Sequence, residues 1–370
     1  MLITVYFFYN YSKFEVFFTE MPLAWQARLS PKEIATFKTL YGEARLSESL
    51  HIQLFRLVIA SRAPGTVSAY IASINRWTAF ARKNGFTEFP PDPHQFSLYI
   101  AHLSEKKASF STFKMIKASF PFYYASRNCE ENCVTKRKFV ALVLDGAMRT
   151  AAKQRGPVKK ASTLGETDIR AFLQSNFWPN QSLDTPNQDL KDWRTGVRLY
   201  SYYMTLCRWD CYSHLTMDSF SFAGDHLVIS FPTRKNDKLY EGSTCVLKFK
   251  PGDSLCPRLI FKTYFDIMGF KSGEDILNCR LTRNGKQARP GTKLSYGQSL
   301  QDSKAIMRKF GLPEISEKSF KASGVTTLLD KKTSLTDVQI YGGWKTEQTP
   351  MFYHNSSVKR RKEISSSLLE

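Results

Sequence analysis

The C-terminal stretch that decides the fold contains Lys318-Ser319-Phe320-Lys321, then Gly342-Gly343-Trp344, then Met351-Phe352-Tyr353-His354. The first motif opens a short segment that is predicted to be helical. The second is a glycine turn that ends in an indole, whose N–H can only donate a hydrogen bond. Tyr353 stands nine residues beyond Trp344, on an amphipathic stretch. The order is therefore a basic cluster, a donor on a turn and a tyrosine.

The net charge indicates the class of partner. Lys and Arg number 53 against 33 Asp and Glu, which gives a formal charge of +20. A surplus of this size favours nucleic acid over a merely solvated basic surface. A structural RNA-binding protein has only this charge in its support, because no motif of stacking aromatic residues accompanies it. The 370 residues, with 42% hydrophobic and 14% aromatic, suffice for two domains with large cores.

Cysteine usage and the N-terminus exclude several other classes. The seven cysteines have irregular spacings, so we expect no disulfide framework, a reducing intracellular location and no secretion. No pair lies at zinc-finger spacing with histidines, so we expect no metal. The apolar start of the chain has no basic n-region and is too short to span a bilayer, and we expect no membrane partner. Residues 1–45 carry no pattern that predicts a structure.

Residues 46–153 show helical periodicity and predict a compact helical DNA clamp. We expect helices that start at Pro64, with Thr66 as the cap, and at Pro93, and two more over 111–125 and 133–152. Their polar faces carry the basic residues that we expect to bind DNA: Arg76, Arg82, Lys83, Lys114, Lys117, Lys136 and Arg137. Residues 154–162 combine Gly, Pro and charge and are predicted to be a linker, in which Lys159 and Lys160 also bind DNA.

Residues 163–358 are predicted to form a second, mixed domain. Helices are expected over 163–177, with Thr167 or Glu166 near the cap, and over 193–203, 255–268 and 299–310. Residues 225–231 and 245–249 read as two strands joined by a polar turn, which is the only hairpin that the sequence predicts with a clear pattern. The last residues, 359–370, form a basic tail. Its Lys359-Arg360-Arg361-Lys362 is a nuclear signal, a DNA-backbone contact or simply a solvated run.

Three further motifs precede or overlap the opening stretch. In the first, Arg208 is followed by Asp210 and then by Leu215-Thr216-Met217-Asp218. In the second, Lys235 stands at the tip of the predicted hairpin. The third continues the basic cluster and reads Ser319-Phe320-Lys321-Ala322-Ser323-Gly324-Val325-Thr326. In this order the motifs resemble the tyrosine recombinases, the phage integrase family, over about residues 50–357. Leu255-Cys256-Pro257-Arg258 makes the resemblance closest to the transposable-element members of the Crypton and DIRS-like type.

The resemblance implies a role for each matched residue. Tyr353 is the nucleophile, Arg208 is the first phosphate arginine with Asp210 behind it, and Lys235 is the general acid. Trp344 donates its indole N–H to a phosphate oxygen. Lys318 stands where the family has histidine, and Lys321 stands where it has the second arginine. A lysine there keeps the charge but loses the planar fork that binds two oxygens at once.

The fold implied is mainly α with a small β component: a helical SAM-like core-binding domain and an α+β catalytic domain that close around DNA. The implied reaction cuts and rejoins double-stranded DNA through a 3′-phosphotyrosine, without cofactor or small-molecule substrate. Protomers are expected to associate on DNA, as a dimer to a tetramer, in the nucleus. The sequence leans toward an enzyme, and the alternative is a transposon-derived DNA-binding protein that lost catalysis because of Lys321.

Overall fold

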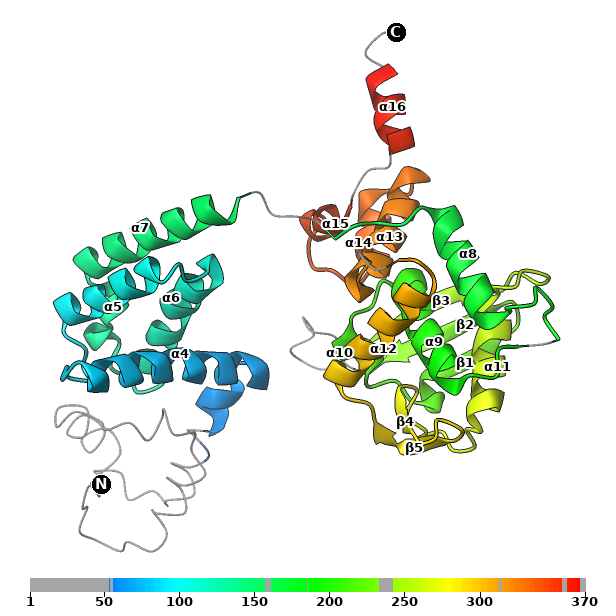
Figure 1. Cartoon of the computed structure of the whole chain (residues 1–370), viewed down its shortest axis with the longest axis horizontal. Coiled ribbons are helices and arrows are strands. Elements are labelled where there is room, and N and C mark those ends of the chain that lie inside the picture. Colours follow the sequence, from blue (N-terminus) through cyan, green and yellow to red (C-terminus); the bar gives the residue numbers. More distant parts are fainter. Residues whose placement is uncertain are drawn as a thin grey trace, which may run out of the picture. The chain divides into compact units, whose positions relative to one another are not determined.

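The chain forms two compact units, Met1–Val158 and Lys159–Glu370, in a computed structural model (Figure 1). The structure describes residues 53, 56–156, 161–184, 186–232, 242–312, 315–354 and 358–366, without the side chains of 358–360 and 364. The N-terminal segment 1–45, the linker lysines Lys159 and Lys160 and the hairpin lysine Lys235 lie outside these residues. Each unit has its own hydrophobic core.

The first unit is entirely helical in its described part. Its elements are α4 (Pro64–Lys83), α5 (Pro93–Glu105), α6 (Phe110–Ala125), the 3₁₀ turns η1 (Glu130–Asn132) and η2 (Val134–Lys136), and α7 (Lys138–Arg155). The core is aromatic: the ring of Trp77 contacts Phe96 and Tyr99 at centroid distances of 4.9 and 5.5 Å. Each fully buried side chain of this size contributes about 2–3 kcal/mol, so the unit has the core of an independent domain.

The helices are where the sequence predicts them, with two corrections at their starts. The predicted cap Thr66 is wrong, because Ala63 precedes the helix and Pro64 takes its first position, where its missing N–H costs nothing. The helix expected from residue 133 begins only at Lys138. Val134 lies in the 3₁₀ turn that leads into this helix, Cys133 directly precedes that turn, and both are buried. Their apolar side chains therefore indicate a place in the core and not a regular helix.

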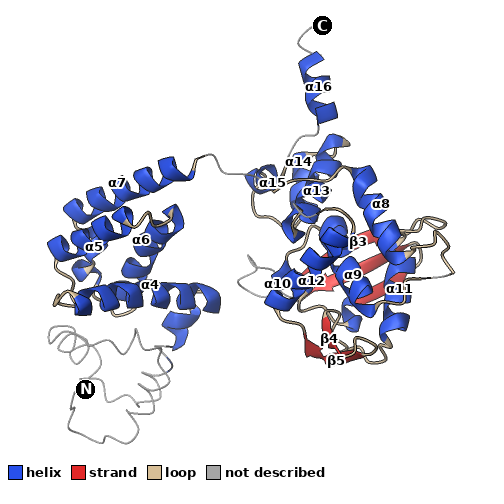
Figure 2. Cartoon of the chain, in the orientation of Figure 1, coloured by secondary structure: helices blue, strands red, loops and turns tan. Residues whose placement is uncertain are grey.

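The second unit combines helices with two small antiparallel sheets (Figure 2). Its elements are α8 (Glu166–Phe177), α9 (Leu190–Thr205), α10 (Trp209–Tyr212), η3 (Met217–Ser219), β1 (Phe220–Ala223), β2 (His226–Phe231), β3 (Ser243–Lys248), α11 (Pro257–Met268), β4 (Cys279–Leu281), β5 (Ala288–Lys293), α12 (Tyr296–Lys309), α13 (Glu317–Asp330), α14 (Leu335–Tyr341), α15 (Gln348–Tyr353) and α16 (Val358–Ser366). Gly165 is the cap of α8, and the expected Glu166 and Thr167 stand next to it, at the first two positions of the helix. The basic tail enters helix α16.

The predicted hairpin is confirmed as β2 and β3, and β1 adds a third strand on the other side of β2. Leu227 pairs with Leu247 and Ile229 with Cys245, and all four side chains are buried. This alternation places one face of the sheet against α11. Phe220 of β1 extends the contact, with its ring 4.8 Å from Phe261 and 5.4 Å from Phe265 of α11. The second sheet, β4–β5, is short and mostly exposed, and the sequence does not predict it.

A buried ionic network ties α9 to the helix that carries the basic cluster. Arg198 of α9 is fully buried, and its Nε lies 3.2 Å from Oε1 of Glu317 at the start of α13. The same guanidinium donates to the Asn278 side chain, to the Ser299 carbonyl and to Ser303 Oγ at 2.7–3.1 Å. Because a buried guanidinium needs both a counter-charge and acceptors, this network fixes where α13 begins relative to α9.

Candidate active site

Arg208 is placed by a sharp reversal at the end of α9. Leu206 adopts the left-handed conformation, with φ of 53°, and its side chain is fully buried. A non-glycine residue there costs about 1 kcal/mol or more, which burial of the leucine side chain offsets. Leu206 packs with Val325, Val338 and Trp344 in a small cluster of its own. Arg208, two residues on, is half-buried at the start of α10 and points back toward this cluster.

Lys321 is placed by the close approach of α13 to the end of α9. A Cβ on Gly324 would lie 2.4 Å from the carbonyl oxygen of Tyr203 and 2.7 Å from Cδ2 of Leu206. Only glycine therefore allows the two helices to pack at this distance. Lys321 stands one turn before Gly324 and is 5% exposed, so its ammonium is held inside the protein. Lys318, on the same helix, is exposed to solvent.

Trp344 is placed by the glycine turn after α14. Gly343 has a φ of 63°, which favours glycine, and the indole folds back over Gly342. The indole is 5% exposed, and its Nε1 has no hydrogen-bond partner among the described residues. A buried donor without an acceptor costs about 1–3 kcal/mol. A buried N–H without an acceptor is expected where that N–H donates to a bound ligand.

Tyr353, at the end of α15, is where these groups meet. Arg208 Nη2 donates to the Tyr353 hydroxyl at 3.1 Å. The Tyr353 ring stacks on Trp344, with centroids 5.7 Å apart and planes inclined by 26°. Lys321 Nζ lies over both rings, 4.5 Å from the Trp344 centroid and 5.0 Å from that of Tyr353. Four side chains from α10, α13, the glycine turn and α15 thus form one site.

Four other tyrosines of this unit are poor candidates for a nucleophile. Burial raises the pKa of Tyr200, Tyr202 and Tyr264 well above the usual range of a phenol. The Tyr341 hydroxyl is engaged, because it donates to the Met204 carbonyl at 2.5 Å. Tyr353 is half-buried and has a guanidinium at its hydroxyl, which is the combination that nucleophilic chemistry on an anion needs.

Two predicted site residues lie apart from this group. Lys318 makes no ion pair within the described residues. Asp210 is exposed, and no hydrogen bond joins its carboxylate to Arg208 in the described structure. Instead the Asp210 charge acts on Lys293 of β5, where it opposes the burial that lowers the pKa of that lysine. The structure therefore offers no contact for the role of Asp210 behind Arg208.

One neighbour of the site is absent from the sequence prediction. His354 Nε2 lies 3.6 Å from Asp330 Oδ1 at the end of α13, a distance suited to an ion pair when the imidazole is protonated. A protonated His354 would join the residue after Tyr353 to the helix that carries Lys321. The only signal for it in the sequence is the position of His354 next to Tyr353, and nothing there points to Asp330.

The seven basic residues expected to bind DNA in the first unit are all exposed, on α4, α6 and the segment before α7. Two of them have acidic partners. Arg82 pairs with Glu88 at 2.5 Å, and Lys117 pairs with Asp145 at 2.8 Å. Both pairs are solvent-exposed and therefore weak. Within the described residues no cluster of His, Cys, Asp or Glu suits a metal ion, and none of the helices has the length and apolarity to cross a membrane.

Gly342 offers a direct test of the indole's position. A Cβ there would meet the six-membered ring of Trp344 at 2.1 Å. Because Gly342 has ordinary helical φ and ψ, Gly342→Ala strains no backbone and only displaces the indole. We expect a loss of about 1–3 kcal/mol in the free energy of unfolding, measured by urea titration.

Gly297→Ala is the matched control, because nothing lies within 4 Å of the added Cβ in α12. We expect this variant to be as stable as the parent or slightly more stable. Equal stabilities of the two variants would contradict the packing of Trp344 over Gly342.

The fold is that of the tyrosine recombinases, with a helical core-binding part and a mixed catalytic part. No protein-family model and no curated protein matches the chain. A solved structure of a lambda integrase dimer bound to a COC′ core site does match, with a TM-score of 0.51 and 14% identity over 87% of this chain and 85% of that one.

Two other solved structures resemble the chain less closely. A Tn1549 transposon integrase in complex with circular intermediate DNA has a TM-score of 0.46, with 11% identity over 90% of this chain and 98% of that one. A XerH site-specific recombinase bound to a palindromic difH substrate has a TM-score of 0.44, with 16% identity over 69% and 70%. None of the three supports the narrower resemblance to Crypton or DIRS-like elements.

Proposed function

We propose that this chain is a DNA-binding recombinase that cuts and rejoins DNA through a 3′-phosphotyrosine. The Tyr353 oxygen bonds to the scissile phosphorus while the bond to the 5′-oxygen breaks. The phenol loses its proton and the leaving 5′-oxygen gains one. A second 5′-hydroxyl then attacks the phosphotyrosine and releases Tyr353. The energy of the phosphodiester is conserved in the covalent intermediate, so no nucleotide cofactor is required.

The observation that carries this proposal is the hydrogen bond from Arg208 to the Tyr353 hydroxyl, inside a site that also holds Lys321 and Trp344. A guanidinium at 3.1 Å from the attacking oxygen can contact that oxygen and a phosphate beside it. Lys321 supplies a second positive charge against the charge that builds on the phosphate. The unpartnered indole N–H of Trp344 supplies a donor for a phosphate oxygen.

Further parts of the proposal rest on the resemblance and on the basic charge of the chain. Lys235, outside the described residues, would protonate the 5′-oxygen. The exposed cations of the first unit, with Lys159 and Lys160, would hold double-stranded DNA. Protomers would associate on that DNA, and a nuclear location and a transposable-element origin belong to the same set of proposals.

The proposal is tested with a pool of nicked duplexes of randomised sequence. After attack near a nick, the short fragment with the free 5′-hydroxyl diffuses away, which traps the protein on the 3′-phosphate of the rest of the cut strand. We expect a covalent adduct that survives denaturing electrophoresis. DNA binding that weakens with salt but yields no adduct would instead favour the alternative, a binding protein without catalysis.

Lys321 is the residue that favours this alternative. Its ammonium lies over two aromatic rings, where it gains cation–π energy, and a single ammonium cannot bind two phosphate oxygens as a guanidinium fork does. The loss of one preorganised donor costs about 3–4 kcal/mol in the transition state. The site then contains its nucleophile, its first arginine and its indole. Its contact with the phosphate through Lys321 is weaker than the contact that an arginine would make.

Lys321→Arg is therefore expected to raise the rate of adduct formation by about a hundredfold. The matched control is Lys331→Arg, an exposed position at the end of the same helix, for which we expect little change. The thermal midpoint of each variant checks that the larger side chain is accommodated. A stable Lys321→Arg variant with an unchanged or lower rate would show that lysine is the functional residue of this site.

A further inference from the structure

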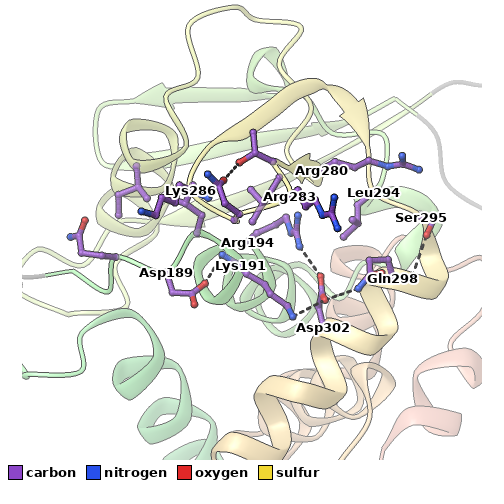
Figure 3. A pocket seen from close by; sticks show the side chains of 17 residues that line it. Asp189, Lys191, Arg194, Arg280, Arg283, Lys286, Leu294, Ser295, Gln298 and Asp302 are labelled. Atoms are coloured by element: carbon purple, nitrogen blue, oxygen red, sulfur yellow. Dashed lines mark hydrogen bonds and ion pairs between the residues drawn. The ribbon is translucent and has the colours of Figure 1, made fainter.

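The catalytic unit has a second concave site, formed by the start of α9, the β4–β5 hairpin and the start of α12 (Figure 3). Its volume is about 970 Å³, at the upper end of the range for ligand pockets. None of its lining residues belongs to the group around Tyr353. The recombinase chemistry proposed above makes no use of this cavity.

The floor of the cavity is a buried ion cluster with a surplus of positive charge. Arg194 and Asp302 are 3% and 2% exposed, and Arg194 Nη2 donates to Asp302 Oδ2 at 2.7 Å. Lys191 Nζ lies 3.3 Å from the other oxygen of the same carboxylate. One acid thus faces two cations. Arg194 Nε is also buried, and it has no acceptor in the described part of the chain.

The rim is basic and has no counter-charges of its own. Arg280, Arg283 and Lys286 all stand on the β4–β5 hairpin, exposed, and none forms an ion pair with another described residue. The second acid of the lining, Asp189, uses Oδ1 to cap α9 through the Lys191 and Asp192 amides. Five basic side chains and two carboxylates therefore line the cavity, and the positive ends of the α9 and α12 dipoles add to the surplus.

The rest of the lining narrows the class of ligand. Its apolar residues are aliphatic: Leu190, Ile267, Leu281 and Leu294. No aromatic side chain is present in the lining for a nucleobase to stack on. The cavity is also larger than a single phosphate requires. These features suit several linked phosphates and offer little to a base.

We propose that this cavity binds a run of linked phosphates through Arg280, Arg283 and Lys286, over the cationic floor of Arg194 and Lys191. The phosphates come either from a small polyphosphate or from a nucleic-acid strand. Tyr296, which follows the lining residue Ser295, packs on Trp209 with ring centroids 5.3 Å apart. Trp209 follows Arg208, so this contact links the edge of the cavity to the group around Tyr353. A strand bound at that group can therefore supply the phosphates. The proposal does not depend on cleavage by Tyr353.

The test uses the full-length protein, inorganic tripolyphosphate and a labelled duplex of arbitrary sequence. In the pocket variant, Arg280, Arg283 and Lys286 are all replaced by glutamine. In the control variant, Lys271, Lys304 and Arg308 are replaced by glutamine, so that three exposed charges are lost outside the cavity. Because all six residues are exposed, we expect both variants to keep the parent's thermal midpoint.

Isothermal titration with tripolyphosphate is expected to show saturable binding to the parent and to the control. The pocket variant is expected to bind at least about tenfold more weakly. If the duplex then binds both variants equally, the ligand is a free polyphosphate. If the pocket variant loses more duplex affinity than the control, the phosphates belong to a strand. Equal behaviour of both variants toward both ligands would overturn the proposal.

The same titrations in the Tyr353→Phe variant keep this proposal apart from the recombinase function. Binding at the cavity is expected to be unchanged there. A protein that forms no DNA adduct but loses tripolyphosphate binding in the pocket variant would refute the proposed function and support this one.

Discussion

Replacing Tyr353 by phenylalanine is expected to abolish the covalent protein–DNA adduct while DNA affinity stays near that of the parent. The substitution removes one oxygen and keeps the ring that stacks on Trp344 and underlies Lys321. The site therefore keeps its packing and both of its cations. Only the atom that bonds to phosphorus is lost, and no other group can take its place in the same geometry. Adduct yield on nicked duplexes and affinity on intact duplexes measure the two effects separately.

Tyr341→Phe is the matched control. This tyrosine packs against the same cluster, but its hydroxyl donates to the Met204 carbonyl. Loss of that bond costs about 1 kcal/mol of stability, and the adduct should persist. An adduct that survives Tyr353→Phe, or disappears equally in both variants, would contradict the assignment of the nucleophile.

Replacing Glu317 by glutamine is expected to cost about 3–5 kcal/mol in the free energy of unfolding of the second unit. Glu317 supplies the carboxylate that pairs with Arg198, which is fully buried. Glutamine has the same shape but no charge, so Arg198 stays buried without its counter-charge. For a unit of this size the thermal midpoint should fall by about 10 °C. Differential scanning calorimetry of the full-length protein measures the shift.

Glu166→Gln is the control for this substitution. Glu166 pairs with Lys331 at 2.7 Å, but both side chains are exposed, at 41% and 58%. An exposed pair of this kind contributes less than about 1 kcal/mol. A similar shift in the two variants would show that the buried network does not hold α13 in place.

Helical periodicity and the β2–β3 hairpin were sufficient to predict most of the fold. Leu227, Ile229 and Leu247 alternate with exposed or half-buried residues, so the strands were visible in the sequence. The second sheet was not visible in the sequence. Its strand β4 is three residues long, and β5 reads Ala-Arg-Pro-Gly-Thr-Lys, which lacks hydrophobic alternation and has a single β-branched residue. The cap of α4 and the start of α7 at Lys138 depended on local capping and burial, which periodicity does not encode.

The candidate site was predictable only in part, for a physical reason. Arg208, Lys321, Trp344 and Tyr353 each belong to a local motif, and the structure brings these four together. The contacts that hold them in place join residues far apart in the chain. Arg198 and Glu317 are 119 positions apart, and no spacing rule pairs them. The same holds for the cavity at the β4–β5 hairpin, whose lining comes from four separate segments.

Lys321 has a consistent place in the fold despite its departure from the family's pattern. An arginine would lay its planar guanidinium against a phosphate, whereas the lysine ammonium sits over the Trp344 and Tyr353 rings. It thereby covers the Tyr353 ring and the indole on which that ring stacks. To cut DNA, the chain would then need Arg208 and the indole N–H to supply most of the stabilisation of the charge on the phosphate.

The most direct measurement is the identification of the residue that carries DNA after reaction with nicked duplexes. Trypsin cuts after Lys345 and Lys359 and releases residues 346–359, in which Tyr353 is the only tyrosine. After nuclease trimming, mass spectrometry is expected to find a nucleotide on this peptide, linked through its 3′-phosphate to Tyr353. A nucleotide on any other peptide, or DNA binding without any adduct in the parent and in Lys321→Arg, would contradict the assignment of Tyr353 as the nucleophile of a working recombinase.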